Sequence, residues 1–139
     1  MEYKRFDNTV VARIDRGEEI LEQMAIIARK ENIKLASVSA LGAAGEITVG
    51  VYDVEKKAYH ANTFTGDLEI VSLTGNISTR NGEIYAHLHM SAGDEQGRVF
   101  GGHLNRAVIC ATCEMFIQII DGAVERKYDE ETGLNVFSF

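Results

Sequence analysis

The feature that most constrains the fold is the long succession of strand-like segments after residue 33. Apolar and β-branched residues recur there in runs separated only by short breaks rich in Gly, Asn and Asp, as in strands joined by hairpin connections. The predicted strands are KLASVSALG, EITVGVYD, KAYHANTF, LEIVSLTGNIST, EIYAHLHM, GRVFGGHL, AVICATCEMFIQII and a short segment at the C-terminus. We interpret GAAG (residues 42–45) and Thr65-Gly66-Asp67 as breaks between strands. This pattern predicts a mostly antiparallel sheet.

Only one segment has a clear helical pattern, and it precedes the strands. Its apolar residues recur at helical spacing, at Ile20, Leu21, Met24, Ile27 and Ala28. Asp15 followed by Glu18 resembles a capping box, so we expect a helix from about Arg16 to Glu31 that covers the sheet. One helix with many strands predicts a single α+β domain over residues 1–139, with the sheet curled into a barrel-like shape.

The composition limits the partners of the chain. Asp and Glu total 21 against 14 Lys and Arg, for a formal net charge of −7, and the basic residues are scattered. Because DNA binding draws much of its affinity from Lys and Arg that neutralise phosphates, this balance disfavours direct DNA binding. No apolar run is long enough for a membrane-spanning helix, and the N-terminus lacks the apolar region of a signal peptide. We therefore expect a cytoplasmic protein with no membrane partner.

The two cysteines, Cys110 and Cys113, form a C-x-x-C pattern inside an apolar run. Such a pattern occurs in redox pairs and as half of a zinc site. A redox pair of the thioredoxin type would open a helix after a strand, and a zinc site would need a second pair of ligands. Residues three apart on a strand point to opposite faces, so we expect two free, buried thiols.

Three of the four histidines lie in one short stretch, HLHMSAGDEQGRVFGGHL (residues 87–104). His87 and His89 are two residues apart on a predicted strand, so their side chains share a face. His103 follows a segment of turn composition. The fourth histidine, His60, is isolated and is interpreted as a surface residue.

The predicted hairpin is centred near Glu95, which places His87 opposite His103 and His89 opposite Gly101. All three imidazoles then lie on one face of a two-stranded ribbon, although a bulge at Gly97 would shift the pairing by one residue.

Two glycines precede the third histidine. Gly101 is expected to leave room beside His89, and Gly102 to bend the backbone so that His103 points inward.

Three neutral imidazoles on one face suit zinc, and nickel, cobalt, copper or iron can also fit. Three protein ligands leave a fourth tetrahedral position open, as in a catalytic zinc site. A metal with an open position can activate a water or polarise a carbonyl. The alternative is that three polar strand residues lie close together without binding a metal, and the spacing alone leaves both interpretations open.

Three segments carry a resemblance to a known family: residues 17–53 (GEEILEQ to VGVYD), LEIVSLTGNIS (residues 68–78) and the histidine stretch that ends in GGHL. They resemble the plants-and-prokaryotes-conserved domain, or PPC domain, over nearly the whole chain. The resemblance implies a homotrimer of α+β subunits. For prokaryotic members it also implies a metal held by the H-x-H pair and the GGH histidine, which match His87, His89 and His103.

The resemblance also brings two functional associations. The fold is similar to that of acetolactate decarboxylase, a zinc enzyme with a three-histidine site, but a fold-level analogy does not supply a function. Prokaryotic members are often labelled as DNA-binding because the plant domain follows AT-hook motifs. The AT-hook core is an Arg-Gly-Arg-Pro type of sequence, and this chain contains no proline.

Two glutamates lie between apolar residues. Glu69, in GDLEIVSL, is the candidate catalytic acid or base, and a solvent-facing glutamate is the open alternative. Glu114, in ATCEMF, could support a ligating histidine or pair with Arg80 or Arg106.

The main hypothesis is therefore a homotrimeric protein that binds zinc or another divalent transition metal and acts on or senses a small molecule. A zinc-dependent lyase or hydrolase and a non-catalytic sensor need the same pocket, so the sequence leaves catalysis open. A DNA-associated regulator, binding directly or through a partner, is the alternative.

Overall fold

A computed structural model describes all residues, 1–139, as one sheet of eight strands and one helix. The elements are β1 (Glu2–Phe6), β2 (Thr9–Asp15), α1 (Ile20–Lys30), β3 (Ala36–Asp53), β4 (Ala58–Arg80), β5 (Glu83–Gly93), β6 (Val99–Ile119), β7 (Glu125–Asp129) and β8 (Leu134–Ser138). The predicted α+β class is confirmed.

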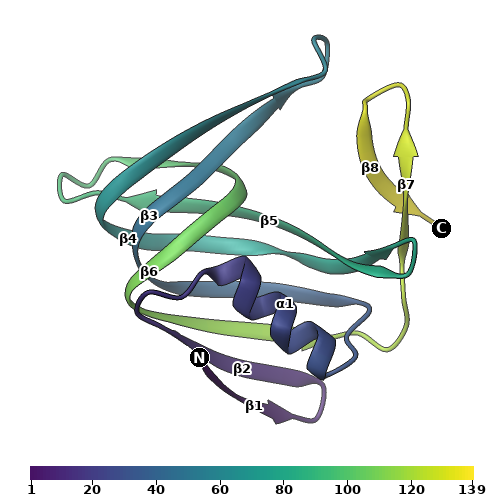
Figure 1. Cartoon of the computed structure of the whole chain (residues 1–139), viewed down its shortest axis with the longest axis horizontal. Helices are drawn as coiled ribbons and strands as arrows, with labels where there is room; N and C mark the ends of the chain where they lie inside the picture. The colour runs from purple at the N-terminus through teal and green to yellow at the C-terminus, as the bar shows by residue number, and fades with distance from the viewer.

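The sheet is curled and almost entirely antiparallel. Its strand order is β1-β2-β6-β3-β4-β7-β8, and β5 pairs with both β4 and β6. The only parallel pairing joins β4 to β7. Because β1 and β8 remain as free edges, the sheet curls as predicted but is not a closed barrel. Figure 1 shows the long β3–β4 hairpin and the β7–β8 hairpin extending toward the same end of the molecule.

The helix covers one face of the sheet, as Figure 1 shows, and contacts β5 and β6. It begins at Ile20 rather than near Arg16. Asp15 still belongs to β2, and Gly17 has a φ of +85°, so a turn separates the strand from the helix. Glu19 is the N-cap: its side chain accepts the backbone N–H of Glu22 at 2.8 Å.

The same Glu19 side chain attaches the helix to the sheet. Its second carboxylate oxygen accepts the backbone N–H of Ala107, in β6, at 2.9 Å. The predicted capping partner Glu18 instead accepts the backbone N–H of Asp15 within the turn. The apolar face of α1 is buried through Ile20, Met24, Ile27 and Ala28.

β3 and β4 run without interruption through the segments predicted as breaks. Residues 42–45 lie inside β3, and Thr65-Gly66-Asp67 lies inside β4. The β3–β6 register shifts between Gly42 and Ala44 and again between Ala44 and Glu46. The predicted breaks were wrong because a glycine at a bulge, which bends a strand, looks in sequence like a glycine in a turn.

Three strands were not predicted: β1, β2 and β7. β1 (EYKRF) and β7 (ERKYD) have five residues each and mostly exposed side chains, so they lack the apolar alternation of a half-buried strand. The predicted short C-terminal strand is β8.

Both cysteines are free, as expected, but only Cys113 is fully buried. Burial raises the pKa of the Cys113 thiol to about 12, so this residue behaves as a packing residue rather than as a nucleophile. The one helix has 11 residues, and the fold contains no helix that is both long and apolar enough to cross a bilayer.

Candidate metal centre

Three histidines meet on one face of the β5–β6 hairpin. His87 and His89 are two residues apart in β5, and His89 lies directly opposite His103 in β6. The ring centroids are separated by 5.2 Å (His87–His89), 5.2 Å (His87–His103) and 5.6 Å (His89–His103). One nitrogen atom from each ring lies within 4.8 Å of the other two.

The predicted register of this hairpin was wrong, but the predicted face was right. His103 pairs with His89 instead of His87, and Gly101 pairs with Ser91 instead of His89. The register therefore differs by two residues. Because side chains alternate with a period of two along a strand, a shift of two residues leaves every side chain on the same face.

The turn explains the register. The backbone N–H of Asp94 donates to the carbonyl of Arg98 at 3.0 Å, and the N–H of Gly97 donates to the carbonyl of Asp94 at 2.9 Å. Gly97 has a φ of +76°. This is the geometry of a three-residue hairpin loop, in which a type I turn is followed by a left-handed glycine.

The glycines of the GGH motif lie against the backbone of neighbouring strands. A Cβ atom on Gly102 would lie 2.5 Å from the carbonyl oxygen of Gly50 in β3, and one on Gly101 would collide with the carbonyl of Met90 in β5. The space beside Gly101 is therefore filled by backbone rather than left open for His89. Both positions need glycine for β6 to pack between β5 and β3.

Tyr59 contacts the third histidine. Its ring meets the His103 ring edge-on, with the centroids 6.0 Å apart. The Tyr59 hydroxyl lies 3.3 Å from the His103 carbonyl oxygen and is hydrogen-bonded to the side chain of Asn105. These contacts hold His103 from the side of β4.

Burial favours the neutral form of two of the histidines. Burial, with smaller contributions from the charges of His103, Arg126 and His89, lowers the pKa of His87 from 6.5 to about 4. Burial also lowers the pKa of His103, and His89 adds to this effect. A neutral imidazole keeps the nitrogen lone pair that a metal needs.

The histidines open into a cavity of about 810 Å³, within the range of small-molecule sites. Its walls come from the β3–β4 hairpin, β5, β6 and the C-terminal β7–β8 hairpin. Lys57, in the turn between β3 and β4, donates to the carbonyl of Glu130 in the β7–β8 turn at 2.6 Å. The two hairpins are thus joined at their tips.

The donor set fits a transition metal. Tetrahedral zinc with Zn–N bonds near 2.0–2.1 Å separates its ligand nitrogens by about 3.4 Å. The three nitrogens already lie within 4.8 Å of one another, so small rotations of the rings would give the zinc spacing. Imidazole suits zinc, copper, nickel and iron. A metal held by these three histidines would have room for a further ligand from the cavity that they line.

The two predicted carboxylates lie outside this cavity. Glu69 and Glu114 are both exposed, because each alternates with buried neighbours along its strand. Glu114 lies opposite Arg13 of β2, and Arg106 pairs with Glu46. The catalytic role of Glu69 stays a prediction, and within its own chain the side chain does not line the histidine cavity.

Several cavity residues were missed by sequence reasoning. Asn76 lies directly opposite His87 in the β4–β5 ladder, and Tyr85 precedes His87 by two residues on the same face. Strand alternation could have identified Tyr85. Arg126 and Asn135 belong to the C-terminal hairpin, and no motif links them to the histidines.

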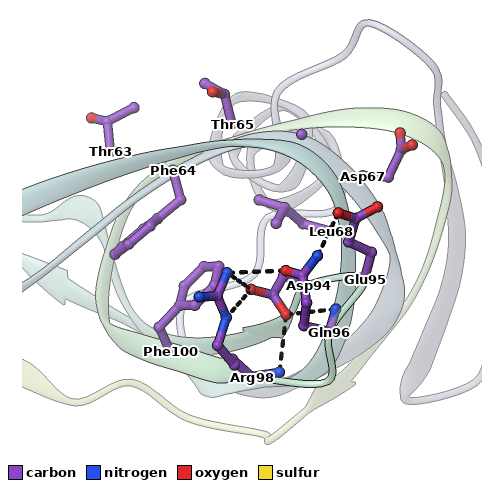
Figure 2. Close-up of a pocket in the computed structure, with 11 residues that line it drawn as sticks. Thr63, Phe64, Thr65, Asp67, Leu68, Asp94, Glu95, Gln96, Arg98 and Phe100 are labelled. Carbon is purple, nitrogen blue, oxygen red and sulfur yellow. Dashed lines mark hydrogen bonds and ion pairs between the residues drawn. The ribbon is translucent and has the colours of Figure 1, made fainter.

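A second cavity, of about 770 Å³, lies between residues 63–68 and the turn between β5 and β6. In Figure 2 the Asp94 carboxylate lies within a network of dashed bonds. It accepts the Arg98 guanidinium at 2.7 Å and the backbone N–H groups of Gln96 and Arg98. The histidine cavity is the stronger candidate for a functional site, because it contains the three converging metal-ligand side chains.

A family model described as the Plants and Prokaryotes Conserved (PCC) domain matches residues 1–121. The match includes all three histidines and ends before β7. The C-terminal hairpin that walls the cavity therefore lies beyond the matched residues.

Solved structures share the whole fold. A protein from Bacteroides thetaiotaomicron, provisionally described as DNA-binding, is 31% identical with a TM-score of 0.96, and the match covers 99% of this chain and 96% of that one. A protein from Archaeoglobus fulgidus described as metal-containing is 34% identical with a TM-score of 0.90, covering 99% and 97%.

Two other relatives are only partly similar. Acetolactate decarboxylase from Bacillus subtilis subspecies spizizenii is 18% identical with a TM-score of 0.58, over 84% of this chain and 54% of that one. This confirms the predicted likeness of fold and nothing more. Bifunctional protein GlmU from Synechococcus sp. (strain JA-3-3Ab) is 27% identical over 124 residues, 87% of this chain, and the chain spans only 19% of that relative.

Proposed function

Because this chain belongs to the Plants and Prokaryotes Conserved domain family, we propose that it binds one divalent metal ion per chain through His87, His89 and His103. The observation that carries the proposal is the convergence of three ring nitrogens within 4.8 Å of one another in the lining of a cavity. The relative from Archaeoglobus fulgidus described as metal-containing supports it. Zinc is the expected ion.

The metal serves a reaction on, or the sensing of, a small molecule. The cavity of about 810 Å³ has room for such a ligand beside the open coordination position. A bound metal there would supply a Lewis acid that polarises a carbonyl or lowers the pKa of a water. The chain's own residues form the walls, keep His87 neutral and orient His103. A lyase, a hydrolase and a sensor all remain compatible with this arrangement.

The assembly is a homotrimer. Supporting this proposal, Leu41, Val71 and Val99 are each more than half exposed. Val71 and Val99 both lie beside the Gly93 backbone, with methyl groups 3.5 and 4.0 Å from the position of a Cβ there. Exposed apolar side chains that cluster in this way favour a protein interface.

The test is the metal content of the untagged protein by plasma mass spectrometry, with the assembly mass from native mass spectrometry. We expect about one metal ion per chain and a mass of three 15.3 kDa chains. The His87→Ala, His89→Ala double variant should lose the metal. His60→Ala is the matched control, because His60 is an exposed histidine of β4 outside the cluster. A double variant that keeps a full equivalent of metal would refute the site.

DNA association is the second candidate, because relatives are provisionally described as DNA-binding proteins. The net charge of −7 weighs against direct binding. We expect no retention of duplex DNA in a filter-binding assay at about 50 mM salt, where electrostatic binding is strong. Retention at that salt concentration that declines as salt is added would favour the alternative.

A further inference from the structure

The C-terminal hairpin places one arginine in the wall of the histidine cavity. Arg126, in β7, is only 8% exposed, yet it lines the same cavity as the three histidines. Its guanidinium lies over two aromatic rings, 4.3 Å from the Phe137 centroid and 4.7 Å from the Tyr85 centroid. The side chain is thus held firmly in one place.

The charge of Arg126 has no anionic partner. Nε donates to the Ser78 hydroxyl at 2.8 Å, Nη1 to the Asn135 carbonyl at 2.8 Å, and Nη2 to the Asn76 side-chain oxygen at 3.0 Å. All three acceptors are neutral, and none of the ion pairs in the chain involves Arg126. A guanidinium has five N–H groups, so two remain free to donate.

An arginine buried without a carboxylate is costly, and the cost points to a missing anion. Burial lowers the pKa of Arg126 from its usual value, although a guanidinium stays charged at neutral pH. A buried cation of this kind is stabilised when an anion enters and accepts its free N–H groups.

Arg126 lies close to the proposed metal ligands. Its Nη2 donates to Asn76, and Asn76 is the cross-strand partner of His87. Directly opposite residues in a sheet have Cβ atoms about 4.5–5.5 Å apart. The guanidinium and the His87 imidazole therefore border the same part of the cavity.

A second polar atom of the hairpin also lacks a partner. The side-chain oxygen of Asn135 is the one buried side-chain nitrogen or oxygen of the chain that forms no hydrogen bond, and Asn135 lines the cavity. An unsatisfied buried acceptor suits a ligand that brings a donor such as a hydroxyl group.

From these contacts we infer that the cavity binds a small carboxylate, with the carboxylate group on Arg126 and a hydroxyl or similar donor directed to Asn135. This inference rests on the proposed metal site in that the ligand occupies the space beside it. The guanidinium, surrounded by neutral residues, supplies a positive charge for the carboxylate in addition to that of the proposed metal ion. The substrate class is therefore small hydroxy- or oxo-carboxylic acids rather than neutral carbonyl compounds.

The probe is glycolate, titrated calorimetrically into the zinc-loaded, untagged protein, with glycolamide as the neutral analogue and inorganic phosphate as another anion. Glycolate is expected to bind at least about tenfold more tightly than glycolamide, because a charge-assisted hydrogen bond exceeds a neutral one by this order. Equal affinities, or no glycolate binding, would overturn the inference. Tighter Arg126-dependent binding of phosphate would overturn the carboxylate assignment.

Two variants test the role of Arg126. Arg126→Gln removes the charge, and Asn76→Asp keeps the shape of the residue but places a carboxylate against the guanidinium. Each should weaken glycolate binding at least about tenfold, whereas the control Arg106→Gln should not, because Arg106 is an exposed arginine paired with Glu46. If the Arg126→Gln protein does not fold, glycolate binding by the Asn76→Asp protein tests the inference. Wild-type affinity in a folded Asn76→Asp protein would overturn the inference.

The metal content of each sample separates this inference from the proposed function. Arg126→Gln and Asn76→Asp should both keep about one metal per chain while losing glycolate. A wild-type protein without metal would count against the proposed function instead, and the same titrations on the metal-free chain would then decide the carboxylate site.

Discussion

Zinc binding by this protein is expected to survive acidification to pH 5.5 far better than binding by three ordinary histidines. An imidazole with a pKa of 6.5 is about ten-elevenths protonated at pH 5.5, so three of them would cost about a thousandfold in affinity. Protonation of His87, which has a pKa of about 4, lowers the zinc affinity very little at that pH. The lowered pKa of His103 reduces the loss of affinity further. We expect the zinc dissociation constant to rise by about a hundredfold or less between pH 7.5 and 5.5.

The measurement is a competition titration against a chromophoric chelator at both pH values, corrected for protonation of the chelator. A thousandfold loss would show that burial does not keep these imidazoles neutral.

The same pKa shift makes the metal-free protein sensitive to acid. The folded-state pKa of His87 lies below the unfolded value of about 6.5, so between pH 6.5 and 4 the unfolded chain binds a proton that the folded chain does not. The free energy of unfolding therefore falls as the pH drops through this window, and above pH 6.5 His87 no longer makes it depend on pH. In urea unfolding of the metal-free protein, His87→Gln should lose less stability between pH 7.5 and 5.5 than the wild type does.

The histidine face could be predicted from the sequence because it depends only on strand alternation. His87 and His89 share a face in any register, and His103 joins them after any shift by an even number of residues. The exact pairing could not be predicted, because it depends on where the left-handed Gly97 closes the turn. Moving the centre of the turn by one residue moves each cross-strand partner by two, so His103 pairs with His89 instead of His87.

The continuity of the strands and the cavity wall could not be predicted, for different physical reasons. Gly42 and Gly66 lie where strands bend, but the glycine-containing segments around them have the composition of turns. Arg126 reaches the cavity only because β7 pairs with β4 through Thr79 and Glu125, a contact between distant segments with no local signal. The candidates Glu69 and Glu114 were chosen because their neighbours are apolar. Apolar neighbours in a strand indicate an outward-facing residue as readily as an enclosed one.

Gly102→Ala is expected to lower both the stability and the zinc affinity of the protein. The new Cβ would lie 2.5 Å from the carbonyl oxygen and 3.1 Å from the nitrogen of Gly50. Both are backbone atoms of β3, so no side chain can rotate away, and β6 must separate from β3. Overpacking of this kind costs about 1–3 kcal/mol or more in the free energy of unfolding. Because His103 is the next residue, we also expect the zinc affinity to fall at least about tenfold.

Gly93→Ala is the matched control, because Gly93 is also a strand glycine at the same hairpin. The nearest atoms to its new Cβ would be side-chain methyl groups, on Val71 at 3.5 Å and on Val99 at 4.0 Å, which are ordinary contacts. Denaturant unfolding of the metal-free proteins and zinc titration compare the two variants. If Gly102→Ala matched Gly93→Ala in both measurements, β6 and β3 would not pack as closely as the structure has them, and the geometry of the third ligand would need revision. If only Gly102→Ala lost both properties, the close packing of β6 against β3 at Gly102 would be what holds His103 beside the two histidines of β5.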